Sequence, residues 1–252
     1  MRAGKSGTVR PLLRVLLLPL DDYRAALRVC LGRPRAHAVA LTGAAFVLSW
    51  WVYVPVHELC HALGCVLAGG AVTRLEIDPL YGATLLQRVF PFVAVGSAYA
   101  GQLTGFDTHG NDLTYLATDF CPFLLTLLVG IPVLRSIRPR PARPLLACVK
   151  FGAALPVAFA PFISITGDYY EMGSILVSRF VALWSPSFPL QRWRSDDFFK
   201  LADHVLRAPG ASLGDVAGVS ASLLLGIALV FATYWVGTLW ARLIRRFHAP
   251  RG

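Results

Sequence analysis

Four long apolar stretches are the feature of this sequence that most restricts its fold. They cover approximately residues 38–66, 113–134, 145–165 and 217–241. A helix needs about 20 residues to cross a hydrocarbon core of roughly 30 Å, and each stretch is long enough. Backbone polar groups inside a bilayer must be satisfied within the segment, which favours helices. The sequence therefore predicts an all-α polytopic membrane protein with about four transmembrane helices.

Composition supports this class and excludes others. Of the 252 residues, 56% are hydrophobic and 15% are charged, whereas soluble domains have about 45–50% apolar and about 25% charged residues. The apolar fraction is too high for a disordered chain. The five cysteines form no paired framework of the kind found in small secreted domains.

The net charge of +10 is concentrated in three blocks. Residues 1–36 carry eight bases and two acids, residues 135–150 carry five bases, and residues 242–252 carry four. Basic blocks beside apolar stretches are typical of the cytoplasmic side of a membrane protein. We therefore predict cytoplasmic N- and C-termini, with the loops 69–112 and 166–216 outside. No basic stripe with interleaved aromatics is present, so nucleic acid is not an expected partner.

A fifth apolar segment, Val89 to Phe106, is rich in Gly and Ser. Counting it as a span would move the basic block 135–143 to the outside. We therefore predict a re-entrant or interfacial segment near 89–106. Its small residues could equally serve close packing.

Two regions are predicted along the chain. Residues 1–36 are expected to form a cytoplasmic amphipathic segment, with Arg24 and Arg28 one helical turn apart. Residues 37–252 are expected to form a single integral-membrane domain. Arginine outnumbers lysine 21 to 3, which is typical of a GC-rich genome, so we expect a bacterial cytoplasmic (inner) membrane protein.

The first apolar stretch contains an HExxH motif, in which His57 and His61 flank Glu58. On a helix, residues four apart project from one face, so two imidazoles can bind one zinc ion while Glu58 reaches a water there. Ionisable groups inside a membrane are costly, which also favours a functional role. The alternative is that both histidines only bond to neighbouring helices. Cys60 lies on another face, and we interpret it as a core residue.

A catalytic zinc usually takes three protein ligands, so another residue must complete the site. Asp168 follows the third apolar stretch, which runs parallel to the first in the predicted topology, and the two outer ends can meet. Glu171, one turn later, is a competing ligand. A helix N-cap is the structural alternative for Asp168.

Asp119 is a second acid within an apolar stretch. One prediction is that its carboxylate orients a ligating histidine. A hydrogen bond to Thr118 or Thr126, or a purely structural role, is the alternative.

The HExxH motif in a first long span, with an aspartate after a later parallel span, resembles the site-2 protease family of intramembrane zinc metalloproteases. The stretch HELCHALGCVLAGGAVTRLEI also resembles that family, in which a small-residue turn and an extended segment follow the motif helix. The resemblance implies that His57, His61 and Asp168 are zinc ligands and that Glu58 is the general base. The chain departs from the family by having Asp168-Tyr169 in place of Asp-Gly and Cys121-Pro122 in place of Gly-Pro.

These features predict a zinc metalloendopeptidase with Zn2+ as cofactor. The expected partners are the lipid bilayer and a transmembrane protein substrate, cleaved in or near a membrane-spanning segment. Two alternatives remain at this stage. One is a zinc-dependent hydrolase of a lipid or small amphiphile, and the other is a non-catalytic membrane scaffold that retains the metal site.

Overall fold

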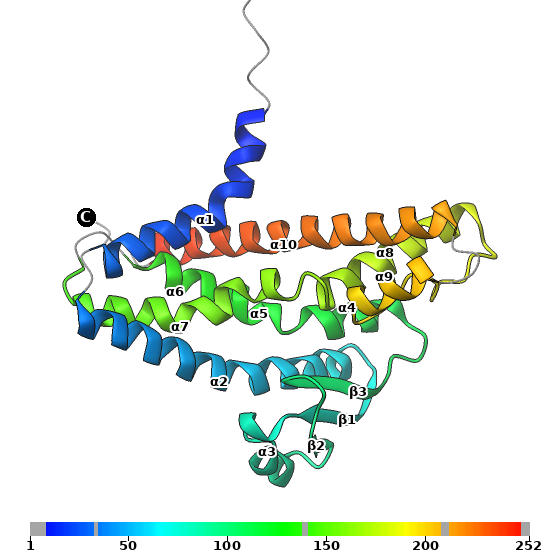
Figure 1. Ribbon diagram of the computed structural model, residues 1–252, viewed down its shortest axis with the longest axis horizontal. Coiled ribbons are helices and arrows are strands. Elements are labelled where there is room, and N and C mark those ends of the chain that lie inside the picture. Colours follow the sequence, from blue (N-terminus) through cyan, green and yellow to red (C-terminus); the bar gives the residue numbers. More distant parts are fainter. Residues whose placement is uncertain (1–8, 33–34, 138–140, 208–211, 248–252) are drawn as a thin grey trace, which may run out of the picture. The chain divides into compact units, whose positions relative to one another are not determined.

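The computed structural model (Figure 1) describes residues 9–32, 35–137, 141–207 and 212–247. Most of these residues are helical, as predicted. The helices are α1 (Val9–Leu31), α2 (Ala36–Leu67), η1 (Pro79–Tyr81, 3-10), α3 (Ala83–Val89), α4 (Asp112–Phe120), α5 (Phe123–Leu125), η2 (Thr126–Gly130, π), α6 (Ile131–Arg135), α7 (Pro144–Ile163), α8 (Asp168–Trp184), α9 (Phe198–Arg207) and α10 (Leu213–Phe247). The strands are β1 (Ala71–Ile77), β2 (Val93–Val95) and β3 (Gly101–Asp107).

By length and composition, three helical segments of the described chain can cross a membrane. They are Ala36–Leu67, Pro144–Trp184 and Leu213–Phe247. A fourth is counted if Asp112–Phe120 and Phe123–Arg135, bent by 49° at the break between them, form one span. The prediction of an all-α membrane protein with about four transmembrane helices is confirmed at this level.

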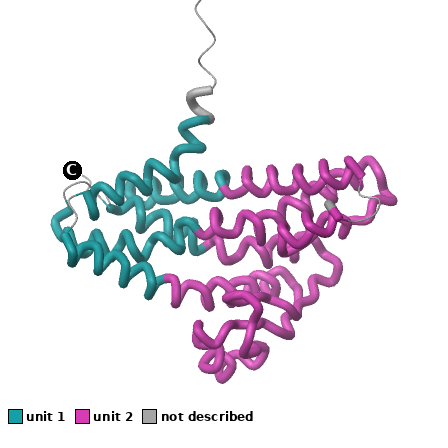
Figure 2. Tube along the Cα trace, viewed as in Figure 1, with its two compact units in different colours: residues 1–49, 125–159, 231–252 teal, residues 50–124, 160–230 magenta. Residues whose placement is uncertain are grey.

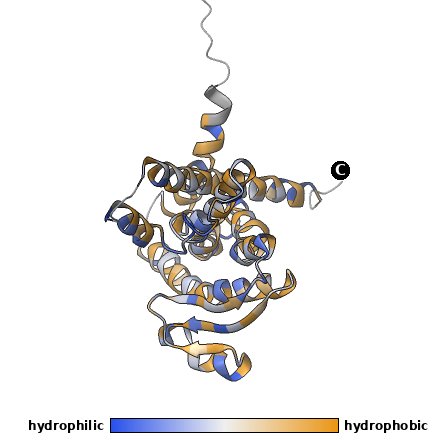
Figure 3. Cartoon of the chain, turned by 90° about the vertical axis from the view of Figure 1, so that its right-hand side faces the viewer, coloured by the Kyte–Doolittle hydropathy of each residue, from blue (hydrophilic) through white to orange (hydrophobic). Residues whose placement is uncertain are grey.

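The surface of α2 supports a membrane location. Val47 and Leu48 on this helix are 65% and 63% exposed, and apolar residues predominate along the long helices (Figure 3). An extended apolar surface of this kind is stable against lipid chains but costly in water. The chain is therefore an integral membrane protein by its helix lengths and by its surface.

The chain divides into two compact units (Figure 2). The first unit comprises residues 1–49, 125–159 and 231–252. It contains α1, whose Arg24 and Arg28 are exposed while Ala26 and Cys30 are buried. This alternation fits an amphipathic helix, and the cytoplasmic amphipathic segment over residues 1–36 stays a prediction.

Ion pairing joins the helices of the first unit. Asp22 of α1 forms a salt bridge with Arg135 of α6, and its carboxylate also accepts a hydrogen bond from Tyr234 of α10 at 3.2 Å. The side chains of Asp22 and Arg135 are only 16% and 14% exposed. Removing one partner of such a pair would leave a buried charge, so the pair fixes these helices together.

The second unit comprises residues 50–124 and 160–230. Its sheet has the strand order β2-β1-β3, with β1 parallel to β2 and antiparallel to β3. The inner face of the sheet carries Leu75, Ile77 and Val93, all 0–1% exposed, against Leu59 of α2. This packing attaches the sheet to the helix that carries the HExxH motif. β3 is an edge strand of the sheet.

Small residues let two pairs of helices approach closely in this unit. A Cβ added to Gly64 of α2 would lie 2.5 Å from the Ala117 carbonyl oxygen on α4. A Cβ added to Gly226 of α10 would lie 2.5 Å from the Tyr169 carbonyl oxygen on α8. Only glycine fits such contacts, so these positions set how near the backbones come.

Three segments of the chain allow the sequence predictions to be compared with the fold. The segment near 89–106 is not a helical span, in agreement with the prediction, but it contains β2 and β3, which the sequence analysis did not predict. The extended segment implied after the motif helix is present as β1. The loop predicted over 166–216 contains α8 and α9. Since α8 belongs to the candidate span Pro144–Trp184, the third apolar segment continues past residue 165, its predicted end.

Candidate metal centre

The HExxH motif lies on α2, where one helical turn separates its two histidines. The Nε2 atoms of His57 and His61 are 3.2 Å apart. The side chains are 14% and 9% exposed. Both ring nitrogens therefore face one small, largely buried space, as the i, i+4 spacing predicts.

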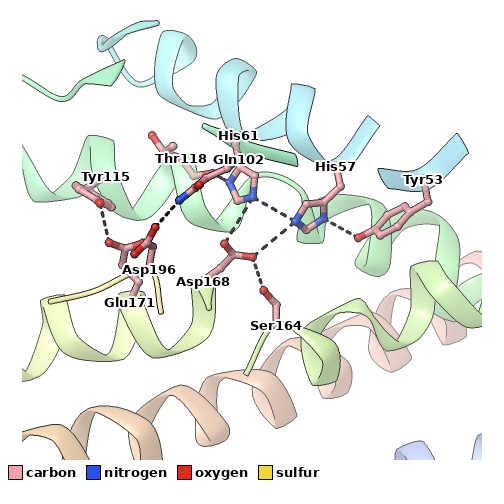
Figure 4. Close-up of polar contacts among 10 residues, drawn as sticks. All are labelled: Tyr53, His57, His61, Gln102, Tyr115, Thr118, Ser164, Asp168, Glu171 and Asp196. Carbon is pink, nitrogen blue, oxygen red and sulfur yellow. Dashed lines mark hydrogen bonds and ion pairs between the residues drawn. The ribbon is translucent and has the colours of Figure 1, made fainter. Parts of the chain in front are cut away.

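Asp168 completes this group from α8. Its Oδ2 is 3.6 Å from Nε2 of His57, and its Oδ1 is 3.6 Å from Nε2 of His61 (Figure 4). The alternative that Asp168 is a helix N-cap is wrong, since Gly167 occupies that position and Asp168 is the first residue of α8. Its carboxylate is free to face the histidines. The structure thus brings together all three predicted ligands, with one ligand atom of each within 4.8 Å of the others.

Hydrogen bonds on the far side of each ring set its orientation. The carbonyl oxygen of Thr118 lies 2.9 Å from Nδ1 of His61. A carbonyl only accepts, so this Nδ1–H donates and Nε2 keeps its lone pair. The Tyr53 hydroxyl lies 2.9 Å from Nδ1 of His57 and can fix the same tautomer there. Ser164 in turn donates to Oδ2 of Asp168 at 2.5 Å.

The separations within this group fit a tetrahedral zinc site. Ligands about 2.0–2.1 Å from zinc lie roughly 3.4 Å from one another in tetrahedral geometry. The shortest observed contacts are 3.2, 3.6 and 3.6 Å, the last two to different oxygens of Asp168. With a single oxygen from Asp168, the three ligand atoms lie within 4.8 Å of one another. Two neutral imidazoles and one carboxylate are also a common donor set of catalytic zinc, which leaves one position for water or substrate.

Glu58 lines the same pocket as the three ligands, beside β3. The backbone of Gly101 passes so close that an added Cβ would overlap Cγ of Glu58 and lie 2.9 Å from its Cδ. Glycine at this position therefore lets the edge strand approach the carboxylate. β3 and the motif helix together determine where Glu58 lies.

Glu171 and Asp119, the other predicted acids, are not members of the three-residue group. Oε1 of Glu171 accepts a hydrogen bond from Tyr115 at 2.6 Å (Figure 4). The predicted hydrogen bond from a histidine to Asp119 is wrong, because both Nδ1 atoms have other partners. Cys60 also lies outside the group, as predicted, and it is half-buried.

The two threonines predicted as alternative partners of Asp119 donate their hydrogen bonds to other groups. The Thr118 hydroxyl donates to the carbonyl of Thr114 at 2.8 Å, and the Thr126 hydroxyl donates to that of Val157 at 2.6 Å. Oδ2 of Asp119 has no hydrogen-bond partner among the described residues, although the residue is only 4% exposed. The role of this carboxylate is therefore not explained by the protein around it.

The three ligands and Glu58 open into a pocket of about 890 Å³. Its walls come from α2, β3, α4, the turn before α8, and residues 191–199. Such a volume accommodates several residues of an extended chain, and it lies within the range of small-molecule and peptide sites. The site is therefore a cavity that reaches the metal ligands.

Comparison of the chain with protein-family models, with curated proteins and with solved structures gives no match. What can be said of function therefore depends on the residues themselves.

Sequence reasoning missed several residues of the site. Tyr53 precedes His57 by four positions on the same helix, so the i, i+4 spacing could have predicted their contact. Thr118 acts through its backbone carbonyl, which leaves no sequence signal. Gln102 donates to Asp196 at 2.6 Å across 94 positions, and no local pattern predicts so distant a contact.

Proposed function

We propose that this protein is an intramembrane zinc metalloprotease that resembles the site-2 protease family. The proposal rests on one observation: His57, His61 and Asp168 lie close together, and Glu58 lines the same pocket. Zinc, when bound, supplies a Lewis acid that polarises a carbonyl and makes water a better nucleophile at neutral pH.

The residues of the chain then have separate roles in peptide hydrolysis. Glu58 accepts a proton from the attacking water and returns it to the leaving amine, so one carboxylate serves as base and then as acid. Tyr53 and the Thr118 carbonyl hold the two imidazoles in the tautomer that ligates. Ser164 holds the Asp168 carboxylate.

The helical spans support a substrate that shares the bilayer. A transmembrane protein substrate and a bacterial inner-membrane location belong to this proposal, as do cytoplasmic termini. An α-helical substrate must unwind locally before its carbonyl can enter, because every peptide carbonyl in a helix interior is already hydrogen-bonded. Segments with helix breakers are the expected targets.

The test is hydrolysis of single-span reporter proteins by the purified chain, with products identified by mass spectrometry. Glu58→Gln should retain zinc and lose about 10²–10⁴-fold in turnover, the usual contribution of a general base. Asp203→Asn, an exposed carboxylate on α9, is the matched control and should keep turnover. Full turnover in Glu58→Gln would refute the mechanism, and release of acyl chains in place of peptides would indicate a lipid hydrolase.

A further inference from the structure

A second group of carboxylates lies beside the proposed ligands in the same pocket. Its members are Asp119 of α4, Glu171 of α8 and Asp196 of the segment before α9, and all three line the cavity. They run from the buried interior to the surface, since Asp119 and Glu171 are 4% and 8% exposed and Asp196 is exposed. We call these three residues the acidic wall.

Among the described residues that line the pocket, one cation, Arg194, acts electrostatically on the acidic wall, through Glu171. In the described chain, none of the three carboxylates takes part in a salt bridge. Arg194 is the single lysine or arginine among the described residues that line the pocket. Its guanidinium is already bound to both oxygens of Asp112, at 2.8 and 2.6 Å.

Neutral donors contact two members of the wall, while one oxygen of the third has no partner within the described part of the chain. Tyr115 donates to Glu171, and Gln102 donates to Asp196 (Figure 4). The oxygen of the third member is Oδ2 of Asp119. When ionised, Asp119 and Asp196 each interact unfavourably with Glu171, whereas Arg194 interacts favourably with it. A buried carboxylate oxygen without a donor is costly, and a ligand that brings donors would relieve that cost.

Asp197 is the next residue after Asp196 of the acidic wall, but its carboxylate accepts hydrogen bonds from the backbone. Its Oδ1 accepts from the backbone N–H groups of Phe199 and Lys200 at 2.9 and 3.0 Å, where it caps α9. The hydrogen bond from Lys200 is the main cause that lowers the pKa of Asp197. Asp197 therefore belongs to the structure of the pocket mouth.

The spacing of the wall favours an organic cation over a second metal ion. Among the described residues, His57, His61 and Asp168 are the one group whose ligand atoms all lie within 4.8 Å of one another. The three carboxylates of the acidic wall do not form a group of this kind. A lysine ammonium has three donors and an arginine guanidinium has five, which suits several carboxylates on one wall.

We propose that Asp119, Glu171 and Asp196 form a subsite for a cationic side chain, lysine or arginine, next to the scissile bond of the substrate. This inference rests on the proposed function. Glu171 is one helical turn from Asp168, and Asp119 follows the residue whose carbonyl holds His61.

The test uses matched hydroxamate probes on the zinc-loaded full-length chain. Each probe carries an aminobutyl or a butyl side chain, placed on either the amino or the carboxyl side of the zinc-binding group. Titration calorimetry should show at least about tenfold tighter binding of the aminobutyl probe in one of the two placements. The isosteric variants Asp119→Asn, Glu171→Gln and Asp196→Asn should bring the affinity ratio towards one, with the zinc content retained. Asp203→Asn, outside the pocket, should keep the ratio.

The outcomes separate this inference from the proposed function. Equal affinity of the paired probes in both placements refutes the subsite alone, and so does a ratio that all three variants leave intact. A second zinc per chain that is lost in Glu171→Gln would make the wall a metal site and also refute the subsite. Failure of every hydroxamate to bind contradicts the zinc site, and the subsite fails with it.

Discussion

Each histidine of the candidate centre uses its two ring nitrogens for different tasks. Nε2 faces Asp168, while Nδ1 is bound to Tyr53 in one case and to the Thr118 carbonyl in the other. Such partners fix the tautomer and rotation of a ligand before the metal arrives. The two bonds differ in kind, since a side-chain hydroxyl can be removed by substitution and a backbone carbonyl cannot.

Tyr53→Phe should therefore lower zinc affinity by about 10- to 100-fold, the usual effect of losing such a partner. The ring itself is 8% exposed and would be kept. Competition with a chelator of known affinity measures the change. Tyr23→Phe, on α1 in the other unit, is the matched control and should bind zinc as the unmodified chain does. Unchanged affinity in Tyr53→Phe would show that the hydroxyl does not orient His57.

Gly101 sets the place of Glu58 in a similar way. Gly101→Ala should push the Glu58 carboxylate out of position, because the added methyl overlaps its side chain. We expect turnover to fall by about 10²-fold, the cost of a small misplacement of a reacting group, with zinc content unchanged. Rates and metal content on the same preparation test this. Normal turnover would mean that β3 shifts to accommodate the methyl group and that Glu58 stays in place.

At the scale of elements, α8 is held in place by α10. Gly226 lets the two backbones meet near Tyr169, the residue after Asp168. Interiors tolerate added volume poorly, because side chains must leave their rotamers or the backbones must separate. The contact between these helices therefore positions the third proposed ligand.

Gly226→Val should destabilise the protein by about 1–3 kcal/mol and weaken zinc binding together with it. Gly43→Val on α2 is the control, since a Cβ there meets nothing within 4 Å. Thermal unfolding in detergent, with and without zinc, compares the two variants. Equal stability of both would show that the α8–α10 contact does not need glycine.

The sequence predicts those elements that depend on residues close together in the chain, such as a motif spacing or an apolar stretch. The HExxH spacing predicts that His57 and His61 share one face, and the four apolar stretches predict the helices that carry them. The predicted topology puts Asp168 at the outer end of a parallel span. It does lie beside the histidines, but within the candidate span Pro144–Trp184 and not beyond its end. β2 and β3 could not be predicted in this way, since β2 is only three residues long, Gly101 and Gly105 weaken the pattern of β3, and pairing with β1 is non-local. For the same reason, the Gln102–Asp196 contact and the acidic wall appear only in the structure.

At the scale of the whole molecule, the basic blocks predict the orientation in the membrane. The helices of the described chain provide three candidate spans, or four with the bent pair. Four crossings place both termini on one side and the segment between α9 and α10 on the other. That side is proposed to be the cytoplasm, as the positive-inside rule predicts from the basic blocks.

Epitope tags test this orientation in spheroplasts. Tags at the two termini should resist external protease until the cells are lysed, and a tag between α9 and α10 should be cleaved in intact cells. A tag joined to a known cytoplasmic protein is the control for lysis. Cleavage of a terminal tag in intact cells would contradict the predicted topology.

The central claim is that His57, His61 and Asp168 bind one zinc ion. X-ray absorption at the zinc edge of the purified protein tests it most directly, combined with zinc content per chain in variants. The account predicts one zinc with two imidazoles and oxygen ligands at about 2.0–2.1 Å, and loss of metal in His57→Ala and in Asp168→Ala but not in Glu171→Gln. A protein that binds no zinc, or that keeps it in Asp168→Ala and loses it in Glu171→Gln, would contradict the claim.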